Sequence, residues 1–347
     1  MRDSLANPLR GTGLAGADLL PIKDAGGVSA LLTRCPAHAQ TPLRSQPDLA
    51  TECGVAEIWI KDERDRMGLG SFKALGAAHA IAREADATGD ASANALAGRT
   101  YVTASAGNHG LSVAAGAAVF GARAVVYLSV TVPEAFAERL RATGADVIRA
   151  GDDYEQSMTA AETAARENGW TLLSDSSWPG YSEMPLRVME GYLQMAAEVA
   201  TQIPEPPTHI LLQAGVGGLA AAFAAHARAV WGDAPHIIVV EPEAAPALIE
   251  SIRTGAIVTT SGPVSNMGRL DCKTPSQIAL AGLARDADSF VTISEEEASG
   301  PLPHLAELGL ASTPSGAAGL AALMAGLPMV GPDARVLAIL SEGPEDA

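Results

Sequence analysis

KDERDRMGLGSFKALGAAHA, residues 61–80, is the most informative stretch of this chain. A β-prone segment, residues 56–60, leads into it, and small helix-forming residues follow Lys73. The pattern predicts a strand, a charged glycine-rich loop and a helix that begins at Lys73. Unpaired N–H groups give a helix N-terminus a positive field, which we expect to disfavour the ammonium form of Lys73. A lysine held as a free amine can condense with an aldehyde, whereas the alternative is an ordinary surface lysine.

A second segment, TASAGNHG at residues 103–110, follows a short predicted strand and opens a helix of small residues. Its glycine turn offers a nest of backbone N–H groups together with the side chains of Ser105 and Asn108. Such a nest is suited to holding a carboxylate. The alternative is a helix N-cap with a turn glycine.

A third segment, QAGVGGLA at residues 213–220, follows an apolar strand and precedes an alanine-rich helix. A glycine loop between a strand and a helix N-terminus can bind phosphate through backbone N–H groups. The loop does not fit G-x-G-x-x-G, because Ala220 stands five positions after Gly215, and it lacks the Lys-Ser/Thr ending of a P-loop. The segment therefore predicts a cradle for one phosphate or, alternatively, close helix–strand packing, and it disfavours a nicotinamide dehydrogenase.

Composition and charge restrict the class of protein. The 347 residues carry a net charge of −17, which argues against nucleic acid and against an anionic membrane surface as partners. The apolar stretches are too short to span a bilayer, and the first residues lack the apolar core of a signal peptide, so we expect a cytoplasmic protein. Cys35, Cys53 and Cys272 show no metal spacing and are expected to be reduced thiols. No metal site is expected, because the carboxylates within residues 62–65 are interpreted as a solvated or ion-paired segment.

Strand and helix patterns alternate along the chain, which predicts an α/β fold with parallel or mostly parallel sheets covered by helices on both faces. The predicted strands are 57–60, 100–103, 124–128, 146–149, 171–173, 209–212, 236–240, 289–293 and 335–340. The predicted helices are 73–84, 110–120, 133–143, 154–168, 187–202, 220–230 and 315–325.

Taken in order, the three segments resemble the fold-type II pyridoxal-phosphate enzymes, the tryptophan synthase β superfamily, and most closely its diaminopropionate ammonia-lyase branch. Further motifs extend the resemblance from about Thr41 to Gly343, namely Ser174 to Tyr181, Gly268 to Cys272, Ser315 to Leu320 and Val336 to Gly343. The resemblance implies two αβα sandwich domains with the cofactor between them. The large domain would comprise residues 1–82 and 181–347, and the small inserted domain would comprise residues 83–180.

The resemblance also implies a role for each matching residue. Lys73 would hold the aldehyde of pyridoxal 5′-phosphate as a Schiff base. Asn108 would hydrogen-bond the phenolic oxygen of the cofactor, and Ser341 would face its pyridine nitrogen. The cofactor phosphate would be bound by Gly215, Val216, Gly217, Gly218 and Leu219. The substrate carboxylate would be held at Ser105, Ala106, Gly107 and His109.

Asp175 would be the acid/base group that removes the α-proton of the substrate. This role requires that burial or a nearby group raises its pKa toward the operating pH. The alternative for Asp175 is an Asx-turn residue before the helix, and from the residues alone Ser341 is better interpreted as an ordinary strand-end or turn serine.

Two positions depart from the lyase pattern. Ala106 replaces an aspartate implicated in deprotonating D-isomers, and Pro314 replaces an expected glutamate. Alanine has no proton to exchange, so we expect selectivity for the L-isomer. The predicted activity is α,β-elimination by a pyridoxal-phosphate-dependent ammonia-lyase, with 2,3-diaminopropionate converted to pyruvate and ammonia.

Two other activities stay open on the same scaffold. Ser-Ala-Gly-Asn-His is similar to the serine/threonine dehydratase version of the motif, which makes a hydroxy-amino acid dehydratase the first alternative. A β-replacement synthase is the second. Members of the family are commonly dimeric, so a homodimer is expected by analogy.

Overall fold

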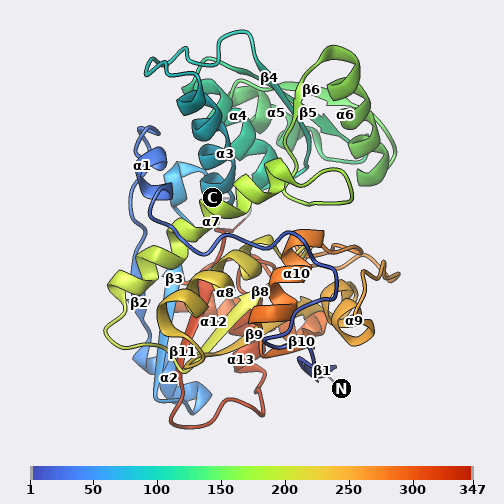
Figure 1. The fold of residues 1–347 in the computed structure, drawn as a ribbon. Coiled ribbons are helices and arrows are strands. Elements are labelled where there is room, and N and C mark those ends of the chain that lie inside the picture. The colour runs from blue at the N-terminus through green and yellow to red at the C-terminus, as the bar shows by residue number, and fades with distance from the viewer. Residues whose placement is uncertain (1–2, 345–347) are drawn as a thin grey trace.

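The structure, a computed structural model, describes residues 3–344 and contains two β-sheets with helices packed around them (Figure 1). The strands are β1 Ser4–Ala6, β2 Leu43–Ser45, β3 Glu57–Asp62, β4 Thr100–Ala104, β5 Arg123–Leu128, β6 Asp146–Arg149, β7 Thr171–Leu172, β8 His209–Gln213, β9 His236–Pro242, β10 Ser289–Ile293 and β11 Arg335–Leu340. The helices are α1 Val28–Leu32, α2 Pro47–Cys53, the 3₁₀ turn η1 Arg66–Gly68, α3 Lys73–Ala87, α4 Asn108–Val119, α5 Glu134–Ala142, α6 Tyr154–Asn168, α7 Glu183–Gln202, α8 Gly218–Trp231, α9 Ala247–Thr254, α10 Gln277–Asp286, α11 Glu295–Ser299, α12 Leu302–Glu307 and α13 Ala318–Met324.

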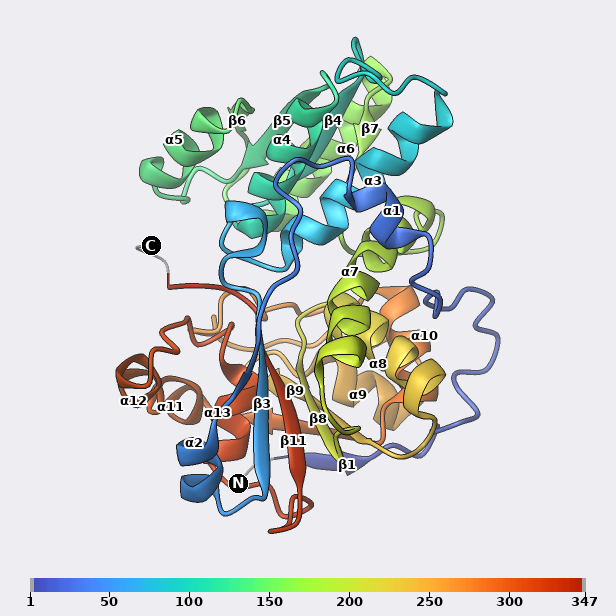
Figure 2. The same cartoon turned by 90° about the vertical axis from the view of Figure 1, so that its left-hand side faces the viewer.

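The larger sheet has the strand order β1-β10-β9-β8-β11-β3-β2. Its five inner strands run parallel, and β1 and β2 pair antiparallel at the two edges. A parallel sheet is buried on both faces, so its strands are almost continuously apolar. In β11, Leu337 and Ile339 pack on the α8 and α10 side, whereas Val336, Ala338 and Leu340 pack on the α13 side. Figure 2 shows this sheet nearly edge-on between the two groups of helices.

The smaller sheet has the order β6-β5-β4-β7, and all of its pairings are parallel. Val102 and Ala104 pack toward α6, whereas Tyr101 packs into the core that contains α3 and α4. All four strands fall within residues 83–180, the range predicted for the small domain. The domain boundaries themselves stay a prediction.

Helix α7 crosses between the two sheets (Figure 1) and packs against both α3 and α8. Two glycines permit the close approach of α3 and α7. A Cβ on Gly191 would lie 2.4 Å from the Leu75 carbonyl oxygen, and a Cβ on Gly76 would lie 2.6 Å from Cε1 of Tyr192. Any larger side chain at these positions would separate the two helices.

The mostly parallel α/β architecture is confirmed, and each of the nine predicted strands is found within two residues of its predicted ends. The sequence did not predict β1, β2, α1, α2, α9, α10, α11 and α12. The first two are three-residue edge strands, too short for a pattern, and α10 is buried along nearly its whole length, which hides a helical period. The predicted start of α7 was wrong by four residues, because a helix tolerates Pro185 in its first turn.

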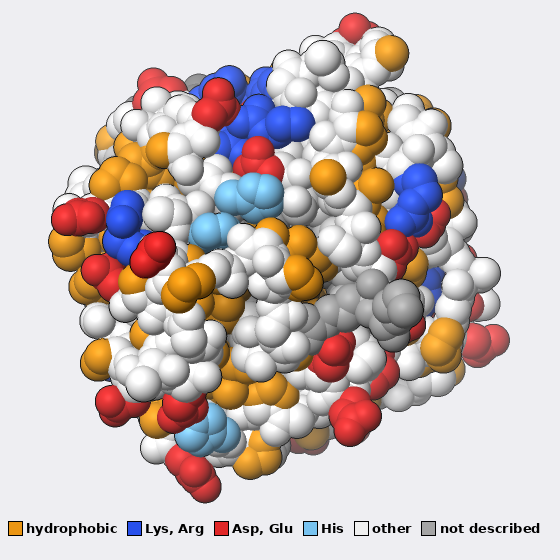
Figure 3. All heavy atoms as spheres, turned by 90° about the horizontal axis from the view of Figure 1, so that it is seen from below, with side chains coloured by type: hydrophobic (Ala, Val, Ile, Leu, Met, Phe, Trp, Pro, Cys, Tyr) orange, Lys and Arg blue, Asp and Glu red, His pale blue; other side chains and the backbone are white. Residues whose placement is uncertain are grey.

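The surface mixes both signs of charge. Figure 3 shows the face seen from below, where acidic, basic and hydrophobic side chains are interspersed. This face does not present the continuous basic surface that binding to a nucleic-acid backbone needs. Among residues 3–344, no helix combines the length and the apolar character needed to cross a bilayer.

Candidate active site

A buried network of charges anchors the segment between β3 and Lys73. Lys61 Nζ donates to Glu198 Oε2 at 2.6 Å, and Arg66 donates to both Glu63 and Glu198 at 2.7 Å. The side chains of these four residues are at most 3% exposed. Buried charges need partners of opposite sign, and here two cations meet two carboxylates.

The network corrects part of the sequence interpretation of residues 62–65. Asp62 and Glu63 are ion-paired but buried, so the solvated alternative is wrong for both. Asp65 is exposed. Asp62 and Glu63 are buried because they continue an inner strand of the larger sheet into the core, a tertiary position that local composition does not reveal.

Lys73 is the first residue of α3, as predicted, and the segment before it is held by residues that follow β11, the neighbouring strand of β3. Phe72 N donates to Ser341 O at 3.1 Å, and Gly343 N donates to Gly70 O at 3.0 Å. The segment just before Lys73 is therefore tied to the residues that follow β11.

The Lys73 ammonium group donates a hydrogen bond to Oδ2 of Asp175, which follows β7. Burial lowers the pKa of Lys73, but the Asp175 carboxylate outweighs burial and raises that pKa above its ordinary value. The expectation that the helix N-terminus holds Lys73 as a free amine is therefore wrong for this structure. A full charge in direct contact outweighs the partial charge of a helix end.

The expected rise in the pKa of Asp175 is also not found. Burial raises the pKa of this carboxyl, but the positive charge of Lys73 and the neighbouring His109 lower it by a larger amount, so that the net shift of the pKa is downward. The side chains of Lys73 and Asp175 are 22% and 18% exposed, so the pair is only partly open to solvent.

The third sequence segment forms a turn between β8 and α8. Gly217 has φ +96°, a conformation that favours glycine, and it stands directly before the first residue of α8. A Cβ on Gly215 would lie 2.9 Å from Sγ of Cys272, so the backbone approaches its neighbours closely there. The first N–H groups of α8 have no partners within the helix, which makes this turn suited to an anion.

The same turn lies close to the lysine–aspartate pair. A Cβ on Gly218 would lie 3.5 Å from Cε2 of Tyr192 and 3.9 Å from the carbonyl oxygen of Asp175. Lys73 Nζ lies 5.9 Å from the centroid of the Tyr192 ring. Three segments that are far apart in the sequence therefore meet around one side chain of α7.

The second sequence segment forms the start of α4. Ser105 Oγ accepts hydrogen bonds from Gly107 N at 3.3 Å and Gly110 N at 3.1 Å, which closes the turn, and Ala106 is exposed. His109 Nε2 donates to Leu173 O at 2.9 Å, so its ring holds the turn against the end of β7. Burial lowers the pKa of His109 below its ordinary value.

Asn108 and Ser341 were both predicted to contact the cofactor ring. Glu342, which the sequence analysis did not select, connects them, because it follows Ser341 in the chain and contacts Asn108. Asn108 Nδ2 donates to Oε2 of Glu342 at 2.6 Å, and Ser341 is buried directly after β11. The available signal for Glu342 was a carboxylate two residues beyond the end of an apolar strand of a parallel sheet, where ligands bind in α/β folds.

Two buried polar atoms near the pair have no hydrogen-bond partner among the described residues, namely the Tyr192 hydroxyl and Nδ1 of His109. Such atoms are uncommon in folded proteins and often mark a ligand contact. The Lys73 amine, the glycine turn at the start of α8 and the polar atoms beside them fit the chemical groups of pyridoxal phosphate. Tyr192 was missed by the sequence analysis, because a tyrosine inside an amphipathic helix resembles an ordinary core residue.

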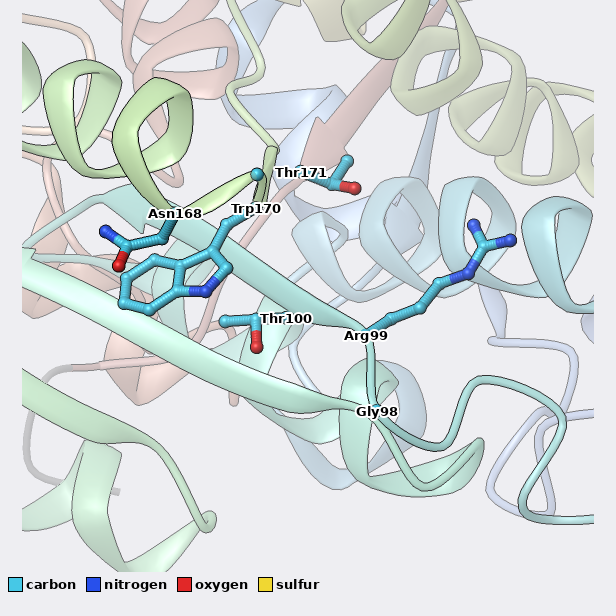
Figure 4. A pocket seen from close by; sticks show the side chains of 7 residues that line it. Gly98, Arg99, Thr100, Asn168, Trp170 and Thr171 are labelled. Atoms are coloured by element: carbon cyan, nitrogen blue, oxygen red, sulfur yellow. The ribbon is translucent and has the colours of Figure 1, made fainter.

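A surface cavity of about 340 Å³ lies elsewhere, at the amino ends of β4 and β7 (Figure 4). It is lined by Gly98 to Thr100 and Asn168 to Thr171. Ligands of open α/β sheets bind at the carboxyl ends of strands, so this cavity is not the candidate site. Within residues 3–344, no group of three or more His, Cys, Asp or Glu side chains is arranged to hold a metal.

The candidate site is thus built at the carboxyl ends of strands from both sheets. Lys73 comes after β3, Ser105 after β4, Asp175 after β7, Gly215 after β8 and Glu342 after β11. A lysine at one helix start and a glycine turn at another, between two α/β units, are the arrangement expected of a fold-type II pyridoxal-phosphate enzyme.

Comparison with known proteins agrees with this class. The model of the pyridoxal-phosphate dependent enzyme family matches residues 35–342, and the chain belongs to that family. Diaminopropionate ammonia-lyase of Escherichia coli K12 is 32% identical over 308 residues, which span 83% of this chain and 77% of that enzyme.

Solved structures of the same enzyme superpose closely. The complex of the Escherichia coli diaminopropionate ammonia-lyase with an aminoacrylate–pyridoxal-phosphate azomethine intermediate has a TM-score of 0.89 at 29% identity, covering 100% of this chain and 94% of that one. Its complex with D-serine has a TM-score of 0.89 at 28% identity, covering 100% and 95%. The chain is therefore an enzyme with pyridoxal phosphate as its cofactor and with a carbon–nitrogen lyase as a relative along its whole length.

Proposed function

We propose that this enzyme is an ammonia-lyase that acts on L-2,3-diaminopropionate. One substrate molecule and one water would give pyruvate and two molecules of ammonia. The observation that carries the proposal is the contact of Lys73 with Asp175 beside the Gly215–Leu219 turn, in a chain similar to diaminopropionate ammonia-lyase over its whole length.

When bound, pyridoxal phosphate supplies an aldehyde that condenses with amines and a ring that withdraws electrons from the substrate. Lys73 Nζ would hold the aldehyde carbon. The backbone N–H groups of Gly215, Val216, Gly217, Gly218 and Leu219 would hold the phosphate. Asn108 would donate to the phenolic oxygen, and the Ser341 hydroxyl would face the ring nitrogen.

Asp175 would take the α-proton on its Oδ2 atom. Its pKa is lowered here mainly because the Lys73 ammonium group touches it. Asp175 can act as a base only when Lys73 carries no positive charge beside it, because burial then raises the pKa of Asp175 toward the range that a general base needs. Loss of the positive charge on Lys73 would thus change Asp175 from an ion-pair partner into a base.

The turn at residues 105–109 would hold the substrate carboxylate. Ser105, Ala106 and Gly107 lie just before α4 and His109 lies in its first turn, where the N–H groups have no partners within the helix. Ala106 is exposed in this turn and cannot carry a proton, which supports selectivity for the L-isomer.

The proposal is tested by turnover of the purified enzyme with L- and D-2,3-diaminopropionate, L-serine and L-threonine in separate assays. Keto acid is measured with a coupled reductase, and Lys73→Ala serves as the blank. We expect fast pyruvate formation from L-2,3-diaminopropionate and at least tenfold slower turnover of the D-isomer. Equal turnover of both isomers would remove the stereochemical part of the proposal.

A hydroxy-amino acid dehydratase is the second candidate, favoured by Ala106 within Ser-Ala-Gly-Asn-His. Keto acid from L-serine or L-threonine alone would establish this activity. Absence of keto acid from all four substrates, with bound cofactor present, would instead indicate a different β-leaving group or a β-replacement synthase that awaits its second substrate.

The organisation of the molecule is proposed along with the activity. The small domain would span residues 83–180 and the large domain residues 1–82 and 181–347, which is supported by a four-stranded sheet confined to residues 100–172. A homodimer is proposed because members of the family are commonly dimeric. The absence of disulfides among Cys35, Cys53 and Cys272 supports a cytoplasmic location.

A further inference from the structure

Glu342 is a buried carboxylate at the junction of the segments that form the candidate site. Its side chain is 5% exposed, and the residue is the second after the end of β11. Asn108 Nδ2 donates to Oε2 at 2.6 Å, the Thr313 hydroxyl donates to Oε1, and Arg269 Nε lies 3.1 Å from Oε2. Both carboxylate oxygens are thus engaged, which fixes the side chain in one orientation.

The backbone of Glu342 is fixed relative to the reactive lysine. Ser71, two residues before Lys73, pairs with Glu342 as an antiparallel bridge, and Gly343 N donates to Gly70 O at 3.0 Å. The space for this chain path depends on Gly316, because a Cβ there would lie 2.8 Å from Cγ of Glu342. Glu342 therefore keeps a set position with respect to Lys73.

The side chain of Glu342 also connects the two sheets. Asn108 is the first residue of α4, which packs on the smaller sheet, whereas Glu342 follows the central region of the larger one. One hydrogen bond of 2.6 Å therefore fixes the position of Asn108 relative to Glu342 and to the segment that leads to Lys73.

A carboxylate decides which way the amide of Asn108 faces. The amide presents two N–H groups at Nδ2 and an acceptor at Oδ1, and the two ends are easily exchanged by rotation. An ionised carboxylate only accepts, so Glu342 selects the Nδ2 end. With one N–H on Glu342, the second N–H of the same nitrogen is left to face the cofactor, where a phenolic oxygen needs a donor.

We propose that Glu342 is a positioning residue that orients the Asn108 amide so that Nδ2 donates to the phenolic oxygen of pyridoxal phosphate. The proposal rests on the cofactor role of Asn108 within the proposed function. It does not depend on which amino acid the enzyme consumes.

The test uses the visible absorption band of the holoenzyme and needs no substrate. The variants are Asn108→Ala, Glu342→Ala, Glu342→Gln and the double variant Asn108→Ala/Glu342→Ala. Glu241→Gln is the matched control, because Glu241 is a buried carboxylate of the same sheet that accepts from Leu248 N and Ile249 N and touches none of the site residues. The absorption maximum and the pH midpoint of the band are recorded from pH 5 to 10, together with the Kd for pyridoxal phosphate.

We expect Asn108→Ala and Glu342→Ala to move the pH midpoint or the absorption maximum in the same direction. A midpoint would move upward by about one unit, the size expected from losing a hydrogen bond to a charged group, because the phenolic oxygen becomes more basic. Glu342→Gln keeps a carbonyl acceptor for Asn108 and is expected to lie closer to the wild type. The double variant should match Asn108→Ala alone, because Glu342 acts only through Asn108.

Two results would overturn the proposal. Additive shifts in the double variant, or a Glu342→Ala enzyme with weaker cofactor binding but an unchanged band, would assign Glu342 a purely structural role. A band unaffected by Asn108→Ala would remove the cofactor role of Asn108 and this proposal with it. The substrate assays above decide the ammonia-lyase activity independently of either result.

Discussion

At the scale of single residues, the chemistry of this site depends on charges that change each other's pKa. Lys73 and Asp175 were each assigned a role from their sequence motifs, but their mutual contact reverses the pKa shift expected for both. A pKa follows from the charges within a few ångströms, and those neighbours are brought together by the fold. The reversal is informative, because it indicates that loss of the positive charge on Lys73 would raise the pKa of Asp175 and allow it to act as a base.

Replacing Asp175 with asparagine should have two opposite effects. Loss of the base should lower turnover of the L-substrate by about 10²- to 10⁴-fold. Loss of the carboxylate should also lower the pKa of Lys73, so that the apoenzyme binds pyridoxal phosphate faster at pH 7 and the pH profile of binding moves to lower pH. Stopped-flow absorbance across pH 6 to 9 measures the second effect, with Asp65→Asn as an exposed control. An unmoved profile would mean that the pair does not control Lys73.

At the scale of elements, α3 and α7 place the reactive lysine. α3 presents Lys73 at its first turn, and α7 contributes Tyr192 beside it, while their crossing is permitted by glycines on both helices. Helix packing at this distance leaves no room for additional atoms. The spacing of these two helices therefore controls the position of the lysine.

Gly191→Ala is expected to destabilise the fold, because the new methyl group would lie 2.4 Å from the Leu75 carbonyl oxygen and 2.8 Å from Cβ of His79. We expect a loss of about 1–3 kcal/mol in the free energy of unfolding, typical of overpacking. Urea unfolding of the apoenzyme measures it. Gly331→Ala is the control, since nothing lies within 4 Å of its Cβ position. Equal stability of the two variants would show that the helices can separate without cost.

Glu198→Ala tests the charge network that connects α7 to β3 and η1. The substitution leaves Lys61 and Arg66 buried with too little negative charge, so we expect a loss of about 3–5 kcal/mol in the free energy of unfolding. The matched control is Glu183→Ala, whose side chain is 75% exposed and pairs with Arg187, and whose loss should cost less than about 1 kcal/mol. Similar denaturant midpoints for both variants would contradict the importance of the buried network.

At the scale of the whole molecule, two parallel sheets present their carboxyl strand ends to a shared site. The larger sheet contributes Lys73, the Gly215–Leu219 turn and Glu342, and the smaller sheet contributes Asn108 and Asp175. Neither sheet carries a complete set of groups. The site therefore exists only when both parts are folded and joined, which makes global stability a condition for activity.

The pH dependence of global stability should include a contribution from Glu241. Burial raises the pKa of Glu241 to about 8, although two backbone N–H donors lower it, whereas its ordinary value is 4.5. Between these values the folded protein keeps a proton that the unfolded chain has released, so the free energy of unfolding falls as pH rises from 4.5 to 8.

Glu241→Gln removes the titrating group. It should therefore remove the fall in the free energy of unfolding with rising pH, which can amount to a few kcal/mol. Urea unfolding of wild type and variant at pH 5, 6, 7 and 8 gives the comparison. The difference between the two proteins should grow in favour of the variant with increasing pH. A difference that is constant across the four pH values would show that Glu241 titrates normally.

Taken by itself, the sequence determined the kind of fold and the motifs of the site. Strands 289–293 and 335–340 and helix 154–168 were predicted with their observed ends, because burial on both strand faces and helical caps such as Asp153 leave local patterns. The motif around Lys73 likewise predicted the start of α3. These features depend on residues that are near each other in the chain.

Tertiary structure alone decided which of these residues touch and in what state of charge. Asp175 stands 102 residues from Lys73, and Glu342 stands 234 residues from Asn108, yet each pair is in hydrogen-bond contact. The sequence could not reveal Tyr192 or the burial of Glu63, because neither has a local signature, and it indicated Glu342 only by its place just beyond an apolar strand. Contact, desolvation and pKa depend on distances in space, and the order of strands in two sheets sets those distances.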